Sequence, residues 1–203
     1  MKKLLLLVML VLLCGCQSPN FIDEHVPEDP VDPSPIAYPD GPYGVNVGEI
    51  VPPGLSWPGY RGWEAETIHI EEFYDPDGTR GINGLLFDVN NWECSPCQAQ
   101  CTSIAAKQEE WSQMGIEAVS MLLRGPNMAT PTMEDALLWK QTWGFESVTV
   151  VLDPAATMVY KLYFSVPWMV VVDPRTMMVY HADSGFNDDY SSLVEILAIE
   201  NMQ

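Results

Sequence analysis

The chain has 203 residues, which is enough for one ordinary domain and an additional segment. Apolar residues make up 47% of it and include 7 Trp, 8 Tyr and 6 Phe, so a wholly disordered chain is excluded. Nine basic residues stand against 28 acidic ones, and because the resulting formal net charge of −19 repels phosphate backbones, nucleic acid is excluded as a partner.

The first sixteen residues have the pattern of an export signal. Two lysines precede the apolar run Leu4 to Leu13, which is too short to cross a bilayer as a helix. The run ends in Leu13-Cys14-Gly15-Cys16 and resembles the lipobox of bacterial lipoproteins, in which a peptidase cuts before the cysteine and acyl chains are attached to it. The resemblance implies that residues 1–15 are a lipoprotein signal peptide and that Cys16 is lipidated and anchors the protein to a bacterial membrane.

The residue after the lipobox bears on which membrane is reached. Gln17, rather than an aspartate, follows Cys16, and by the usual sorting rule this implies the outer membrane, at its periplasmic face or the cell surface, rather than the inner membrane. The alternative is a plain secretory signal with incidental cysteines. Both interpretations place the mature protein outside the cytoplasm.

Residues 16–55 differ in composition from the rest of the chain. Ten of the 17 prolines and seven acidic residues lie between Gln17 and Pro58, without a single Lys or Arg. We therefore expect 16–55 to be an extended acidic tether and 56–203 to be the domain. The later part of the tether carries apolar residues that we expect to dock on the domain as an extra strand: Tyr38, Tyr43, Val45, Val47 and Ile50.

Strand and helix patterns alternate along the domain. Short apolar runs predict strands at 85–89, 116–123, 148–152, 168–172 and 177–180. Helices are predicted at 95–114, from Thr130 (as N-cap, with Pro131 in the first turn) to 144, at 155–162, and after a capping box at 192–195. This alternation predicts an α/β domain in which βαβ crossovers build a central mixed sheet flanked by helices.

Two cysteines lie where the first strand of this domain meets its first helix. Cys94-Ser95-Pro96-Cys97 places Cys94 at the helix N-terminus, where free backbone N–H groups and the helix dipole stabilise a thiolate. The spacing allows the pair to close a disulfide, and in an exported chain this favours redox chemistry over metal binding. The neighbouring Glu93 opposes the effect, because a carboxylate raises the pKa of a thiol beside it.

With this motif the chain resembles the thioredoxin superfamily from about residue 45 to 203. Phe164-Ser165-Val166-Pro167-Trp168 is similar to the cis-proline loop of that family, and Asp88 lies six residues before Cys94, where relatives carry a buried acidic residue. The resemblance implies a thioredoxin-like fold with an N-terminal β extension. It is closest to membrane-tethered, extracytoplasmic members, some of which reduce apocytochrome c or other exported proteins.

The resemblance implies a role for each site residue. Cys94 attacks a substrate disulfide, Cys97 resolves the mixed disulfide, and Asp88 accepts the proton of Cys97. Relatives carry Trp immediately before the first cysteine, whereas here that position is Glu93 and the tryptophan lies one residue earlier. The residues expected to contact the substrate peptide are Trp92, Val166 and Pro167.

These observations predict a lipid-anchored thiol–disulfide oxidoreductase that acts on disulfide-bearing exported proteins. We expect no cofactor and no resident metal, and since the sequence has no nicotinamide or flavin motif, an upstream membrane reductant has to re-reduce the cysteine pair. The P-x-x-x-T-x-x-C signature of peroxiredoxins is absent ahead of Cys94, which disfavours peroxide reduction.

Two other functions remain open at this point. Cys101 follows Cys97 by one helical turn, and a buried inert thiol is its simplest interpretation. The spacing Cys97-x-x-x-Cys101 also resembles that of Sco-type copper proteins, with His181 as the distant ligand. A third interpretation is a thioredoxin-fold binding module whose disulfide is structural. Separately, the alternative for Asp88 is an ordinary strand carboxylate at an edge.

Overall fold

A computed structural model describes residues 37–159, 165–186 and 189–203. In this part of the chain seven strands form one sheet, in the order β2-β1-β5-β4-β3-β6-β7. The three central strands β3, β4 and β5 are parallel, and the outer strands join them antiparallel. The strands are β1 Ser56–Arg61, β2 Glu64–His69, β3 Gly84–Asn91, β4 Ile116–Arg124, β5 Thr149–Leu152, β6 Trp168–Asp173 and β7 Met178–Ser184.

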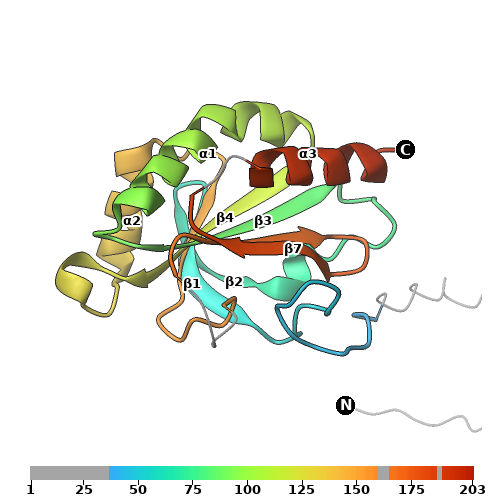
Figure 1. The fold of residues 1–203 in the computed structure, drawn as a ribbon, viewed down its shortest axis with the longest axis horizontal. Coiled ribbons are helices and arrows are strands. Elements are labelled where there is room, and N and C mark those ends of the chain that lie inside the picture. The colour runs from blue at the N-terminus through green and yellow to red at the C-terminus, as the bar shows by residue number, and fades with distance from the viewer. Residues whose placement is uncertain (1–36, 160–164, 187–188) are drawn as a thin grey trace, which may run out of the picture. The chain divides into compact units, whose positions relative to one another are not determined.

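In the described residues three α-helices lie along the sheet (Figure 1), and their buried side chains form one core with it. This arrangement confirms the predicted α/β class, with a mixed sheet flanked by helices and a β hairpin, β1–β2, added ahead of the central strands. None of the helices in the described residues is both long and apolar enough to span a membrane. The helices are α1 Ser95–Gln113, α2 Met133–Trp143 and α3 Asp189–Asn201, with two short 3₁₀ turns, η1 Ile70–Phe73 and η2 Pro126–Met128.

Buried side chains form a second core, separate from the one that the three helices share. Residues 37–55, part of the expected tether, lie against this second core and against the edge of β7. Val45 and Val51 are buried there among apolar side chains of the sheet. The backbone N–H of Val179 in β7 donates to the carbonyl of Glu49 at 2.8 Å, and Gly48 N–H donates back to the Val179 carbonyl at 2.9 Å. This segment therefore belongs to the packed structure, and it covers part of the outer edge of β7.

Helix α2 begins two residues later than predicted. Its N-cap is Thr132 instead of Thr130, because the carboxylate of Asp135 accepts from both the backbone N–H and the hydroxyl of Thr132 at 2.8 Å. Thr130 has Met133 at the corresponding position, three residues on, and a thioether cannot complete a capping box. The helix ends at Gly144, which adopts the left-handed conformation with φ 62°.

Two further helix predictions were wrong, one in its first residue and one because the described part of its range holds no helix. Helix α3 begins at Asp189, so Ser192 lies inside it, and Glu195 accepts from Lys107 and Trp111 of α1 instead of capping its own helix. The described part of the helix expected at 155–162, residues 155–159, consists of turns. There Asp153 accepts from the backbone N–H of Thr157 at 2.7 Å, which holds the chain in a turn.

Candidate active site

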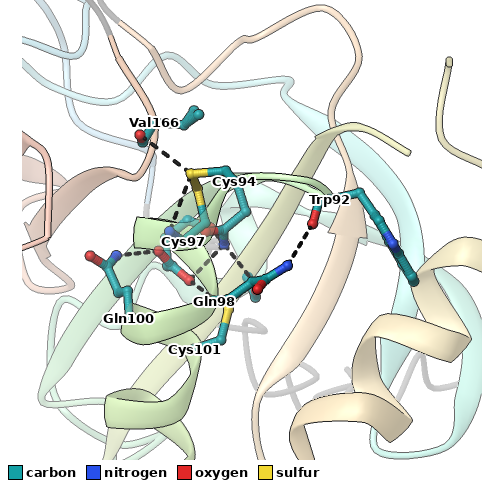
Figure 2. The surroundings of a disulfide bond; sticks show 10 residues. Trp92, Cys94, Cys97, Gln98, Gln100, Cys101 and Val166 are labelled. Carbon is teal, nitrogen blue, oxygen red and sulfur yellow. Dashed lines mark hydrogen bonds between the residues drawn. A yellow bond between two sulfur atoms is a disulfide. The ribbon is translucent and has the colours of Figure 1, made fainter. Parts of the chain in front are cut away.

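Cys94 and Cys97 form a disulfide at the N-terminus of α1 (Figure 2). Cys94 is the N-cap of the helix, and its sulfur accepts from the backbone N–H of Cys97 at 3.2 Å. The two cysteines differ in access to solvent, because Cys94 is half-buried whereas Cys97 is fully buried. Cys94, the more accessible of the two cysteines, is therefore the one that lies at the positive end of the helix dipole.

The predicted cis-proline loop lies directly beside this disulfide. The peptide bond between Val166 and Pro167 is cis, and the Val166 carbonyl oxygen is 3.5 Å from the sulfur of Cys94 (Figure 2). The structure thus brings together two segments separated by 72 residues in the sequence. Pro167 is buried and has no N–H to donate. The backbone groups available to a partner at this point are therefore those of Val166, the residue before it.

Trp92 lies apart from the sulfurs. In Figure 2 its ring points away from the disulfide, and it packs on Trp139 of α2 with ring centroids 5.3 Å apart. Its backbone carbonyl accepts from the side-chain amide of Gln98 at 3.2 Å. Trp92 thus packs between the cysteine motif and α2, and its ring lies away from the face on which Cys94 and Val166 meet.

The exposed carboxylate of Glu93 is held by the loop after β4. It accepts from the backbone N–H of Asn127 at 3.0 Å, and Asn127 has the left-handed φ of 55°. The next residue, Met128, is also left-handed and lines a cavity of about 230 Å³ together with Arg124. The η2 loop therefore contacts the cysteine motif through Glu93.

Asp88 on β3 is buried beneath α1, with 1% of its surface exposed. Its Oδ2 atom accepts from the side-chain amide of Asn90 at 2.7 Å, and its Oδ1 atom accepts from the side-chain amide of Gln100. Burial raises the pKa of Asp88 to about 7, and the hydrogen bonds from Asn90 and Gln100 act in the opposite direction. The carboxyl group therefore titrates near neutral pH.

A buried polar network around Asp88 was missed from the sequence. The amide of Asn90 also donates to the hydroxyl of Ser120 on β4 at 3.1 Å, and the indole N–H of Trp139 donates to the same hydroxyl at 3.1 Å. The network thus links the carboxyl group of Asp88 to Trp139, on which Trp92 packs. The available signal was polarity at buried positions, since Asn90 follows Asp88 by two residues and so lies on the same face of β3.

The third cysteine of the domain belongs to this network. Cys101 is fully buried, its sulfur lies 3.9 Å from Oδ2 of Asp88, and burial raises the pKa of its thiol well above the ordinary range. His181 lies on β7. Within the described ranges no three or more His, Cys, Asp and Glu side chains are grouped so as to hold a metal ion. The structure thus does not bring the copper set Cys97, Cys101 and His181 together.

Solved structures, but no sequence relatives, resemble this chain. Neither a protein-family model nor a curated protein matches the sequence. Among solved structures, a protein from Chlorobium tepidum described as the thiol:disulfide interchange protein DsbE aligns with a TM-score of 0.58 and 16% identity over 79% of this chain and 100% of its own. The thioredoxin domain of a thiol-disulfide oxidoreductase from Bacteroides vulgatus aligns with a TM-score of 0.56 and 13% identity, over 76% of this chain and 99% of its own.

A different class of thiol protein shares the fold. The reduced 2-Cys peroxiredoxin of Plasmodium vivax aligns with a TM-score of 0.58 and 14% identity over 77% of this chain and 83% of its own. Fold similarity alone therefore does not separate disulfide exchange from peroxide reduction, and the cysteine motif has to do so. The chain has a thioredoxin-like fold that carries a Cys94–Cys97 disulfide at the start of its first α-helix, beside a cis-proline loop.

Proposed function

We propose that this protein is a thiol–disulfide oxidoreductase that exchanges disulfides with exported proteins through Cys94 and Cys97. One observation carries the proposal: the half-exposed Cys94 sulfur lies at a helix N-terminus, 3.5 Å from the carbonyl oxygen of Val166, and is joined to the buried Cys97. A substrate cysteine can approach Cys94 while its backbone lies against the backbone carbonyl of Val166, the residue before Pro167. Peroxide reduction is disfavoured because the peroxiredoxin motif is missing ahead of Cys94.

The difference in burial sets the order of the steps. In the reduced protein the Cys94 thiolate attacks a substrate disulfide, one substrate sulfur leaves as a thiolate, and a mixed disulfide with Cys94 forms. The Cys97 thiol then loses its proton and attacks the Cys94 sulfur, which expels the second substrate sulfur. Asp88 is the proposed acceptor of that proton, because its pKa of about 7 allows both protonation states at neutral pH.

Each turnover leaves the Cys94–Cys97 disulfide and transfers two electrons to the substrate. A dithiol outside the chain has to reverse this step, and we propose a membrane reductant for that role. Anchoring through acyl chains on Cys16 would hold the domain at the membrane where such a partner lies. Residue 16 lies outside the described residues, so this part of the proposal is based on the sequence resemblance to lipoproteins.

A redox titration tests the proposal against a merely structural disulfide. The purified chain is equilibrated in glutathione buffers of graded potential, the free thiols are alkylated, and the state of Cys94 and Cys97 is read by peptide mass spectrometry. We expect a midpoint between about −120 and −270 mV, the range of catalytic dithiols. A disulfide that stays intact at potentials below about −300 mV would instead be structural, and the proposed activity would then be wrong.

Direct transfer to a protein substrate provides the second test. Reduced chain is mixed with a disulfide-bonded exported protein, and the appearance of substrate thiols is followed over time. We expect transfer with the reduced wild type and none with Cys94→Ser. The Cys97→Ser variant should stop at the mixed disulfide between Cys94 and the substrate, because the resolving sulfur is missing.

A further inference from the structure

We propose that Gln100 is a positioning residue that holds the carboxyl group of Asp88 in both of its protonation states by turning its side-chain amide. The inference deepens the function proposed above, since it concerns the group that takes the proton of Cys97. It rests on the contacts of a side chain that no sequence motif indicates. Gln100 lies on the buried face of α1, one turn after Cys97 and beside Cys101.

The contacts of Gln100 are those of a dedicated partner. The side chain is fully buried, and its Nε2 atom donates to Oδ1 of Asp88, the oxygen that Asn90 does not bind. The two amides thus take one carboxyl oxygen each. A buried glutamine costs desolvation free energy that a leucine at the same position would avoid, so its retention in the core calls for a polar partner of this kind.

The other end of the amide shows why the arrangement serves two states. The Oε1 atom of Gln100 is buried without a hydrogen-bond partner in the described residues. With Asp88 ionised, Nε2 is the correct group to face the carboxylate. With Asp88 protonated, a half-turn of the amide brings Oε1 to accept from the carboxylic O–H. A side-chain amide can donate to the carboxylate and accept from the carboxylic acid, whereas an apolar side chain can do neither.

The surroundings leave few other groups to set the charge of Asp88. Helix α1 brings the thiol of Cys101, whereas Cys97, one turn earlier, is part of the disulfide and does not titrate in the oxidised chain. The partners of Asp88 in the neighbouring strands are Ser120 on β4 and Met169 on β6, and neither side chain ionises. The amide donors therefore provide the main stabilisation of the charged form, and burial is the main opposing influence.

Removing the amide should shift the titration of Asp88 upward. A donor contributes more to an ionised acceptor than to a neutral one, so the variant Gln100→Met loses more stabilisation of the carboxylate than of the acid. We expect the midpoint of Asp88 to rise by about one pH unit. The midpoint is read from the ¹³C chemical shift of the Asp88 side-chain carboxyl in the oxidised full chain, titrated between pH 5 and 9.

Two further variants make the result decisive. Gln113→Met changes the same residue type at an exposed position on the same helix and should leave the midpoint unchanged. Gln100→Asn keeps the amide but is one methylene shorter, so it should also raise the midpoint, and it covers the case in which Gln100→Met fails to fold. A midpoint that stays at the wild-type value in a folded Gln100 variant overturns the proposal.

A kinetic arm separates this proposal from the proposed function. The rate of release of a mixed disulfide from Cys94 is measured against pH, with and without Asp88→Asn. In the wild-type background, Gln100→Met should shift the midpoint of this pH–rate profile to higher pH. In the Asp88→Asn background the same substitution should leave the profile unchanged. A chain without any exchange activity would refute the proposed function, while the carboxyl titration would still decide the role of Gln100.

Discussion

The sulfur of Cys101 lies 3.9 Å from Oδ2 of Asp88, so the buried carboxyl group contacts a thiol that is one helical turn beyond the disulfide. Burial and the nearby carboxylate both raise the pKa of the Cys101 thiol, which keeps it protonated and unreactive. Its contribution is a weak hydrogen bond within the network that holds Asp88.

Stepwise alkylation checks this assignment. We expect iodoacetamide to modify Cys94 first in the reduced native protein, Cys97 more slowly because it is buried, and Cys101 only after denaturation. Peptide mass spectrometry reads the order, with Cys101→Ala as the control for peptide assignment. Modification of Cys101 at the rate of Cys94 under native conditions would show that the thiol is accessible after all.

Asp88 should make the stability of the oxidised protein depend on pH. Its pKa is about 7 in the folded state and near the ordinary value of 3.8 in the unfolded chain, so the folded state binds the extra proton between about pH 4 and 7. Stability from this group is thus fully present below about pH 4, falls as pH rises to about 7 and then stays level. Urea unfolding at pH 5 and pH 8 measures the change.

The variant Asp88→Asn removes this charge and its dependence on pH. We expect its free energy of unfolding, relative to wild type, to be higher at pH 8 than at pH 5 by about 1–3 kcal/mol. The comparison between the two pH values cancels changes in packing, which are the same at both. Equal differences at pH 5 and pH 8 would contradict a raised pKa for Asp88.

Glu93 should weaken the reactivity of Cys94 only slightly. Its carboxylate is exposed and is held by Asn127 of the η2 loop, so its effect on the neighbouring thiol is screened by solvent and salt. We expect Glu93→Gln to lower the pKa of Cys94 by less than about half a unit, with a smaller effect in high salt. Thiolate absorbance at 240 nm against pH measures it, and an effect that ignores salt would point to a structural cause.

Release of the hydrogen bond at Glu93 has a separate consequence for the loop. The charged acceptor is lost in Glu93→Ala, and the left-handed conformation of Asn127 is then held only by its neighbours. We expect faster amide exchange at Asn127 and Met128 in this variant, while strands β3 and β4 stay protected. Unchanged exchange would show that the loop holds its own conformation.

The sequence predicts strands β3 to β7 and the position of the disulfide well, because both depend on local pattern, but it predicts neither β1 nor β2. Short apolar runs lie within Gly84–Asn91 and Ile116–Arg124, and the Cys94 motif lies at a strand–helix junction that the pattern already marks. Helix starts were predicted less well. Thr130 and Thr132 are both good caps, and the choice depends on a carboxylate three residues on.

The residues around Asp88 could not be predicted, because they come from three elements that meet only in the fold. Asn90 and Ser120 lie on neighbouring strands, and Gln100 lies on the helix above them. A glutamine in a helix is most often at the surface, so nothing in the local pattern indicates its burial. The direction of the Trp92 ring depends in the same way on where α2 places Trp139.

The packing of residues 37–55 against β7 limits how far the domain could move from an anchor. For a chain held at Cys16, as proposed, only residues 17–36 lie between the lipid and the packed region. Twenty residues span at most about 70 Å even when fully extended. The active site would then work within a shallow layer above the membrane, where the local concentration of substrates held in the same layer is high and distant soluble proteins have to diffuse into it.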